Sequence, residues 1–207
     1  MAWAAPPSLA PMTATPSPPA RSVRHDRRPE PSGESAQGPR RRAPAATLVL
    51  ARATHAEGIR AIYNRAIETS TATFEMTPKS LPEQLEWIAE HSGAHPAVVA
   101  VDDQDRVLGF GSLSPYRPRP AYSTTVENSV YVDETFQRRG IGRAILDELL
   151  RLAQAHGFHV VIARIAGDND ASVALHTACG FEMVGVEHEV GRKFGRWLDV
   201  VCMQHLL

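Results

Sequence analysis

The stretch Gln137-Arg138-Arg139-Gly140-Ile141-Gly142 carries the strongest structural signal in this sequence. It follows the strand-like segment Asn128 to Val132 and opens a segment with helical apolar spacing that runs to about Gly157. Glycine lets the backbone approach a ligand closely, and the first turn of a helix leaves its N–H groups unpaired. The stretch therefore predicts a nest of backbone amides that binds phosphate.

The spacing of this glycine turn differs from that of the two commoner phosphate-binding loops. A Walker loop needs Gly-Lys followed by Ser or Thr, and a dinucleotide-binding loop needs Gly-x-Gly-x-x-Gly directly after a strand. Neither pattern is present around Gly140. On the motif alone, the alternative interpretation is a plain tight turn before a helix.

Composition divides the chain near residue 46. Residues 1–46 hold ten of the sixteen prolines and seven arginines against three acidic residues. Such a segment buries too little apolar surface to offset the entropy lost on ordering, so we expect it to be disordered. Its first basic residue is Arg21 and prolines interrupt everything before it, which argues against a secretory signal. An organelle transit peptide, an over-long start and a species-specific extension stay open.

Residues 47–207 are long enough for one domain with a sizeable core, and they carry fifteen basic against twenty acidic side chains. This balance offers no broad cationic surface for nucleic acid or an anionic membrane, so we expect a small-molecule partner. Cys179 and Cys202 lack metal-ligand spacing, which predicts reduced thiols, no bound metal and a cytoplasmic location. No apolar run approaches the roughly eighteen residues that span a bilayer.

Apolar periodicity predicts alternating strands and helices. Thr54 with Glu57 forms a capping-box pattern before a first helix, and Ser80 opens a second helix with Leu85 and Ile88 on one face. The remaining expected elements are strands at 47–52, 97–101, 107–113, 124–133, 160–163, 181–188 and 197–204, and helices at 141–157 and 170–179. Their order predicts an α/β fold, a mixed sheet with helices on both faces.

A second signature lies downstream of the glycine turn, in Asn169-Asp170-Ala171-Ser172-Val173-Ala174-Leu175-His176-Thr177-Ala178-Cys179-Gly180-Phe181. This segment resembles the Asn…Leu-Tyr-x-x-x-Gly-Phe signature of the Gcn5-related N-acetyltransferase (GNAT) superfamily. The stretch from Gln137 to Gly142 resembles the acyl-CoA pyrophosphate loop of the same superfamily. The two signatures together imply a GNAT fold with a largely antiparallel central sheet, and acetyl-CoA as co-substrate.

Most of residues 47–206 resemble one branch of the superfamily, the phosphinothricin and methionine sulfoximine N-acetyltransferases. Three segments carry this resemblance, Ile67-Glu68-Thr69-Ser70-Thr71-Ala72-Thr73-Phe74, Tyr122-Ser123-Thr124-Thr125-Val126-Glu127-Asn128-Ser129-Val130-Tyr131-Val132 and Lys193-Phe194-Gly195-Arg196-Trp197-Leu198-Asp199-Val200. The resemblance implies a homodimer that acetylates the α-amine of a small amino-acid-like acceptor. Such a transfer needs deprotonation of the ammonium, a positioned nucleophile and stabilisation of an oxyanion.

Two residues are the candidate catalytic groups. Glu127 stands where the branch places a glutamate, and partial burial would raise its pKa toward that of an effective general base. A surface or ion-paired glutamate is the alternative. His176 stands where many superfamily members have a tyrosine proposed to protonate the leaving thiolate, and an imidazole can donate that proton or relay one. A histidine that caps or packs within the helix is the alternative.

The resemblance also implies which residues hold the acyl donor. Backbone groups of the strand, together with the Asn169 side chain, are expected to contact pantetheine, and the loop amides are expected to hold the pyrophosphate. These donor-binding residues are Val130, Tyr131, Val132, Arg138, Arg139, Gly140, Ile141, Gly142, Arg143 and Asn169. Whether the arginine side chains add charge or are solvated surface stays open, and so does a plain N-cap role for Asn169.

The acceptor of the branch carries an α-carboxylate and a polar tail, which guanidinium groups bind in two-pronged fashion. Arg117 and Arg119 flank Pro118 in a proline-stiffened loop just before Tyr122, so these residues are the candidate acceptor ligands. Phe74 is the candidate apolar wall, and residues 193–199 are expected to form a further rim. The alternatives are a surface loop whose arginines point to water and a core role for Phe74.

The sequence thus predicts an acetyl-CoA-dependent N-acetyltransferase that uses direct transfer without an acyl-enzyme. The first alternative is a protein N-terminal or polyamine acetyltransferase, which should present an open acidic groove where this chain has an arginine-bearing loop. The second alternative is a non-catalytic acyl-CoA-binding module, and the presence of Glu127 argues against it.

Overall fold

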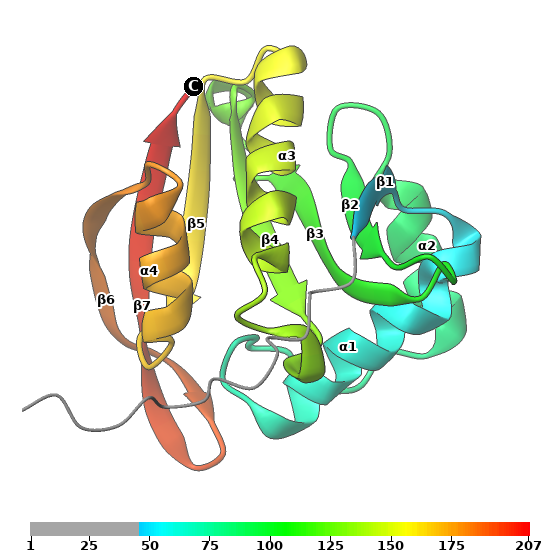
Figure 1. The fold of residues 1–207 in the computed structure, drawn as a ribbon. Coiled ribbons are helices and arrows are strands. Elements are labelled where there is room, and N and C mark those ends of the chain that lie inside the picture. The colour runs from blue at the N-terminus through cyan, green and yellow to red at the C-terminus, as the bar shows by residue number, and fades with distance from the viewer. Residues whose placement is uncertain (1–45) are drawn as a thin grey trace, which may run out of the picture. The chain divides into compact units, whose positions relative to one another are not determined.

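The structure, a computed structural model, describes residues 46–207. The extension predicted to be disordered lies, up to residue 45, outside this range. Within the described range the strands form one sheet in the order β1-β2-β3-β4-β5-β7-β6 (Figure 1). Neighbouring strands are antiparallel except β4 and β5, which are parallel. The strands are β1 (Thr47–Leu50), β2 (Ala97–Val101), β3 (Val107–Pro115), β4 (Thr125–Val132), β5 (Val160–Ala166), β6 (Glu182–Lys193) and β7 (Arg196–Leu206).

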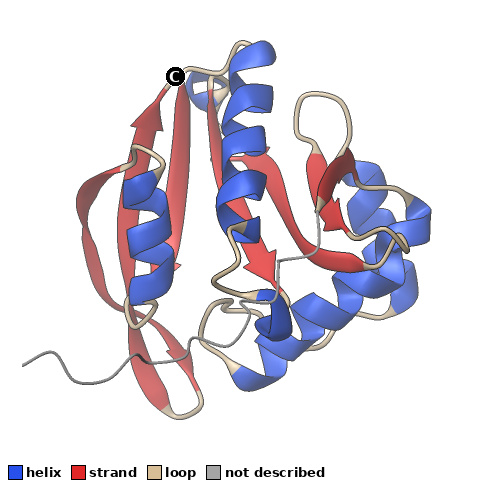
Figure 2. Ribbon diagram, viewed as in Figure 1, coloured by secondary structure: helices blue, strands red, loops and turns tan. Residues whose placement is uncertain are grey.

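Helices cover both faces of this sheet, as Figure 2 shows. In the described part of the chain they are α1 (Ala56–Thr69), α2 (Leu81–Glu90), α3 (Ile141–Ala155) and α4 (Asp170–Ala178). Strand β2 is buried throughout because its side chains alternate between the two layers. Val98 and Ala100 belong to the core beneath α3, whereas Val99 and Val101 belong to the core beneath α1 and α2. The expected α/β fold with a mixed sheet is confirmed.

Helix α3 begins at the predicted glycine turn and crosses the centre of the sheet. Its stripe of Ile141, Ile145 and Leu149 is buried, which fits apolar residues at helical spacing. The helix lies close to β3 because Gly111 has no side chain. A Cβ atom at Gly111 would stand only 2.6 Å from Cγ2 of Ile145. None of the helices among residues 46–207 has the length and apolar character needed to cross a membrane.

The predicted start of α1 is wrong. Residues 53–55 form a 3₁₀ turn, and α1 begins at Ala56 after it. Thr54 lies inside this turn with helical backbone, so it lacks the extended conformation of a capping residue. The ring of His55 takes part instead, since the Arg52 N–H donates to His55 Nδ1 at 3.1 Å.

Helix α2 has the predicted cap but a different buried face. The Ser80 N–H donates to the Glu83 carboxylate at 2.7 Å, and the Glu83 N–H donates back to Ser80 Oγ at 3.5 Å. The buried stripe is centred on Gln84 and Ile88, one turn apart. Leu85 lies about 100° around the helix axis from Gln84 and is 39% exposed, so its predicted place on the core face is wrong.

Strands β6 and β7 are longer than their apolar patterns predicted. They continue as a hairpin to a turn at Phe194 and Gly195, both of which have positive φ. The register of β6 against β7 shifts between Glu187 and Gly191. This irregularity interrupts the alternation of side chains, and for that reason the sequence pattern ended the first strand too early.

Candidate active site

The sheet opens at its centre, between β4 and β5. These two strands pair only over residues 125–128 of β4 and 160–163 of β5. Beyond this point residues 129–132 pair with β3 alone, and residues 164–166 pair with β7 alone (Figure 1). The facing backbone groups of the two diverging segments, which we call the fork, have no strand partner. They are therefore available to hydrogen-bond an extended ligand.

A groove of about 430 Å³ runs along the fork between α1 and the end of β4. Four of the predicted donor-binding residues line this groove, namely Val130, Tyr131, Val132 and Asn169. Asn169 has a second role, because its Oδ1 accepts the Ser172 N–H at 3.1 Å and so caps α4. On the opposite wall Arg65 of α1 reaches Glu134, with 2.6 Å between Nη2 and Oε1. Sequence patterns gave no indication of this cation in the groove.

The predicted phosphate nest lies at the N-terminus of α3. Arg138 and Gly140 both have left-handed backbone, with φ of 58° and 84°. Within residues 46–207 no backbone carbonyl accepts a hydrogen bond from the N–H groups of residues 138–143, and the first such bond runs from Ala144 to Gly140. A run of unpaired amides at a helix N-terminus, next to left-handed residues, is the arrangement that binds an anion.

Side chains in the nest differ in their surroundings. Those of Arg138 and Arg139 are exposed, and Arg143 lies 3.6 Å from Asp147 one turn along α3. Ile141 is buried in the core. A Cβ atom at Gly142 would stand 3.3 Å from Cδ2 of Leu175, so this glycine lets α3 lie against α4. The backbone of the nest, more than its arginine side chains, has the geometry of an anion site.

Glu127 lines a cavity of about 550 Å³ on the face of β4 that α1 covers. Burial is the largest influence on this side chain and raises the pKa of Glu127, while the Arg164 guanidinium acts in the opposite direction. The cavity meets the small cavity at the base of the fork, since Ser129, Tyr131 and Arg164 line both. A half-buried carboxylate with a raised pKa therefore stands next to the place where the fork begins.

His176 is buried, with 3% exposure, and both ring nitrogens have partners. Nδ1 lies 2.8 Å from the carbonyl oxygen of Ser172, which can only accept, so Nδ1 carries the proton. Nε2 of the neutral ring then accepts from Nδ2 of Asn128 at 3.0 Å. Burial lowers the pKa of His176, which favours this neutral form. The side chain reaches the base of the fork, but as a hydrogen-bonded link between α4 and β4.

Of the predicted acceptor ligands, Phe74 alone lines the cavity of Glu127. Arg117 and Arg119 are exposed, and the Arg117 guanidinium lies over the rings of Tyr116 and Tyr122, at 4.8 and 5.6 Å from their centroids. The structure thus brings Glu127 together with the donor-binding strand and Phe74. It does not bring the arginine-bearing loop into the same cavity.

A buried lysine fixes the segment that carries Phe74. Lys193 of β6 is 3% exposed, and its Nζ donates to the carbonyl oxygen of Thr73 at 2.8 Å. Burial lowers the pKa of Lys193. The resemblance implied that residues 193–199 form a rim of the acceptor site, but only the structure shows that the Lys193 side chain ties the hairpin of β6 and β7 to the wall of the cavity.

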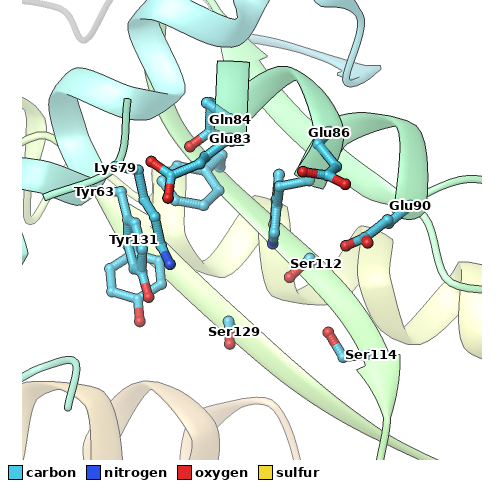
Figure 3. Close-up of a pocket in the computed structure, with 12 residues that line it drawn as sticks. Tyr63, Lys79, Glu83, Gln84, Glu86, Glu90, Ser112, Ser114, Ser129 and Tyr131 are labelled. Carbon is cyan, nitrogen blue, oxygen red and sulfur yellow. The ribbon is translucent and has the colours of Figure 1, made fainter. Parts of the chain in front are cut away.

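A further cavity of about 410 Å³ lies between α2 and strands β3 and β4 (Figure 3). Glu83, Glu86 and Glu90 line it from α2, where their spacing places them on one side of the helix. It adjoins the cavity of Glu127, since Tyr63 and Tyr131 line both. Lys79 also lines this cavity, so its lining is predominantly but not wholly acidic (Figure 3). The chain therefore has a mainly acidic groove as well as an arginine-bearing loop. The expectation that the arginine-bearing loop takes the place of an acidic groove was therefore wrong.

Comparison with known proteins identifies the family. The model of the acetyltransferase (GNAT) family matches residues 59–181, which is more than half of the chain. The chain belongs to the GNAT family. This result confirms the expected superfamily and class of enzyme, an acetyltransferase.

Three GNAT relatives are informative about the branch. The L-methionine sulfoximine/L-methionine sulfone acetyltransferase of Pseudomonas paraeruginosa is 42% identical over 148 residues, which are 71% of this chain and 86% of that protein. A phosphinothricin acetyltransferase from Sinorhizobium meliloti, solved in complex with AcCoA, has a TM-score of 0.76 at 40% identity, covering 78% of this chain and 88% of that one. The ribosomal-protein-alanine N-acetyltransferase from Brucella melitensis has a TM-score of 0.76 at 37% identity, covering 78% and 99%.

Proposed function

We propose that this GNAT enzyme acetylates the amine of a small amino-acid-like acceptor, such as methionine sulfoximine or phosphinothricin, with acetyl-CoA as the donor. The observation that carries the proposal is the position of Glu127, a half-buried carboxylate in a cavity that meets the base of the fork. The names of the Pseudomonas and Sinorhizobium relatives support the class of acceptor. The homodimer and the cytoplasmic location stay predictions.

The donor has a complementary surface along the fork. The backbone groups of residues 129–132 that face away from β3 suit the amide-bearing pantetheine arm, and the unpaired amides of residues 138–143 suit the pyrophosphate. Asn169 lines the same groove. This arrangement directs the thioester toward the base of the fork, beside the cavity of Glu127.

Glu127 acts as the general base in this account. The acceptor ammonium gives a proton to the Glu127 carboxylate, directly or through one water, and the free amine attacks the thioester carbonyl carbon. The N–C bond forms, the C–S bond breaks, and CoA leaves as a thiolate that then takes up a proton. A raised pKa makes the carboxylate a better proton acceptor than an exposed glutamate.

His176 has a positioning role in this account. Its Nδ1 proton is held by Ser172 and its Nε2 accepts from Asn128, so the neutral ring has no proton directed at the leaving sulfur. The link holds β4 and α4 together at the base of the fork, where Asn169 of the same α4 segment lines the donor groove. The sequence-based hypothesis of a proton donor is therefore the less favoured one.

A peptide amine is the second candidate acceptor, because the acidic groove along α2 adjoins the cavity of Glu127. Carboxylates in such a groove would attract a basic peptide. The Brucella relative, named for a ribosomal protein, supports this alternative. Arg164 in the cavity itself favours an acceptor with a free carboxylate.

The experiment that tests the proposal is a screen of acetyl-CoA turnover against amino acids, sulfoximines, phosphinates, polyamines and short peptides, with products identified by mass spectrometry. We expect saturable N-acetylation of at least one acceptor that has a free α-carboxylate. Acetylation confined to peptides or polyamines would contradict the proposal and leave the second candidate in its place.

A further inference from the structure

Strand β5 carries one charged side chain, Arg164, directly after the last pair that joins β4 to β5, Asn128 with Ala163. Side chains alternate along a strand, so Arg164 shares a face with Ile162, and Ile162 is paired with Glu127. Arg164 and Glu127 are therefore diagonal neighbours across the two strands, a spacing that long side chains can span. Both line the same cavity.

The charges in this cavity suit a zwitterion. Among the residues that the structure describes, Arg164 is the one basic residue that lines it, and the other ionisable side chains that line it include the carboxylates Glu75 and Glu127. An α-amino acid carries its ammonium and its carboxylate on one carbon. A site that places a base beside the ammonium therefore needs a cation close by for the carboxylate. Arg117 and Arg119 do not line this cavity.

The Arg164 guanidinium is only partly engaged within the protein. Its Nη2 donates to Oε2 of Glu187 on β6, and among the described residues neither Nη1 nor Nε of Arg164 makes a hydrogen bond. Glu187 lines a neighbouring cavity and not the one that holds Glu127. The Glu187 carboxylate thus occupies one edge of the planar guanidinium group, which can bind a carboxylate through a pair of hydrogen bonds.

We propose that Arg164 binds the α-carboxylate of the acceptor and thereby places its amine at Glu127, an inference that rests on the proposed function. Glu187 then acts as an internal competitor for the same guanidinium. This role differs from that of a structural ion pair, because the loss of Arg164 and the loss of the Glu187 charge have different effects on acceptor binding. Loss of Arg164 weakens acceptor binding, whereas loss of the Glu187 charge leaves it unchanged or strengthens it.

The test compares Arg164→Gln with Glu187→Gln, which remove the same ion pair. We expect R164Q to raise KM for methionine sulfoximine about 10- to 100-fold, the usual effect of losing charge-assisted hydrogen bonds, with little change in KM for acetyl-CoA. E187Q should leave KM for the acceptor unchanged or lower it. Arg164→Lys keeps the positive charge but lacks the paired N–H donors of the guanidinium, so its KM for the acceptor should fall between those of R164Q and the wild type. Arg151→Gln, which breaks an exposed ion pair on α3, is the matched control and should behave as the wild type.

The methyl ester of methionine sulfoximine separates carboxylate recognition from a general defect. For this ester the KM of R164Q should lie close to that of the wild type, because the ester has no carboxylate to bind. A similar rise in KM for R164Q and E187Q, an R164Q defect that persists with the ester, or R164Q kinetics equal to those of the wild type would each overturn the inference alone. A wild-type enzyme that acetylates no α-amino acid would instead overturn the proposed function, and the inference with it.

Discussion

At Glu127 burial and neighbouring charges act on one carboxyl group. Burial raises the pKa of this group, the positive charge of Arg164 acts against that rise, and the negative charge of Glu187 adds to it. The base must be deprotonated to accept a proton from the acceptor ammonium. Activity is therefore expected to fall as the pH falls through the raised pKa, at a higher pH than an exposed glutamate would give.

Replacing Glu127 with Gln keeps the shape of the side chain and removes its basicity. We expect turnover to fall by about 10² to 10⁴, the usual contribution of a general base, and the acid limb of the kcat profile to disappear. Affinity for acetyl-CoA, measured by calorimetry, should be retained because Glu127 does not line the donor groove. Unchanged turnover, or an acid limb that persists in the variant, would remove Glu127 from this role.

His176 gives a second prediction at the scale of one residue. His176→Ala leaves the buried Asn128 side-chain amide without its partner and removes the ring's bond to the Ser172 carbonyl, so the free energy of unfolding should fall by about 1 to 3 kcal/mol. A positioning residue should lower kcat without changing the alkaline limb of its pH profile. Loss of that limb with unchanged stability would instead show that His176 is the proton donor.

At the scale of the element, the turn into α3 depends on the left-handed backbone of Gly140. Gly140→Ala should cost about 1 to 2 kcal/mol in stability, since a Cβ atom disfavours this conformation although the space around it is open. The amides of the nest would also shift, which should raise KM for acetyl-CoA roughly tenfold.

Gly157 provides the control for this substitution. It has a φ of 78° and open space for a Cβ atom, but it follows the C-terminal end of α3. Gly157→Ala should lose similar stability in thermal denaturation and keep the wild-type KM for acetyl-CoA. Equal KM values for the two variants would show that the nest does not bind the pyrophosphate.

Most elements of the fold could be predicted because their apolar spacing is local. The stripe of α3 and the alternation in β4 are visible over a few residues, and so is the cap at Ser80. The start of α1 could not be predicted from the Thr54 pattern. The backbone N–H of Arg52 donates to the His55 ring, and Thr54 lies inside the 3₁₀ turn, where it does not cap the helix. The length of β6 depends on its pairing with β7, which is not local.

The residues of the candidate site were likewise predictable only where the signal in the sequence is local. Residues on β4 and at the start of α4 were predicted to line the donor groove, and they do so because motif and location coincide. Arg164 was missed, because its role arises from strand pairing. Lys193 was expected only as part of a rim, because its bond to Thr73 joins residues 120 positions apart in the chain. A charged residue within the apolar strand Val160–Ala166 was the available signal for Arg164.

At the scale of the whole molecule, the fork separates β1 to β4 from β5 to β7, and the donor groove is lined from both sides. A ligand that contacts both parts of a folded chain stabilises it against unfolding. Acetyl-CoA at about one hundred times its Kd should therefore add about 2.7 kcal/mol to the free energy of unfolding. Denaturant titrations with and without acetyl-CoA measure this, and Gly140→Ala should show a smaller increment at the same concentration.

The central claim is that the cavity of Glu127 takes a small acceptor with a free amine and a free carboxylate. Its most direct test is the ratio of kcat/KM for methionine sulfoximine to kcat/KM for a short peptide with an N-terminal alanine, both measured with saturating acetyl-CoA. We predict a ratio well above ten. Rapid acetylation of the peptide with no detectable acetylation of methionine sulfoximine or phosphinothricin would contradict the account.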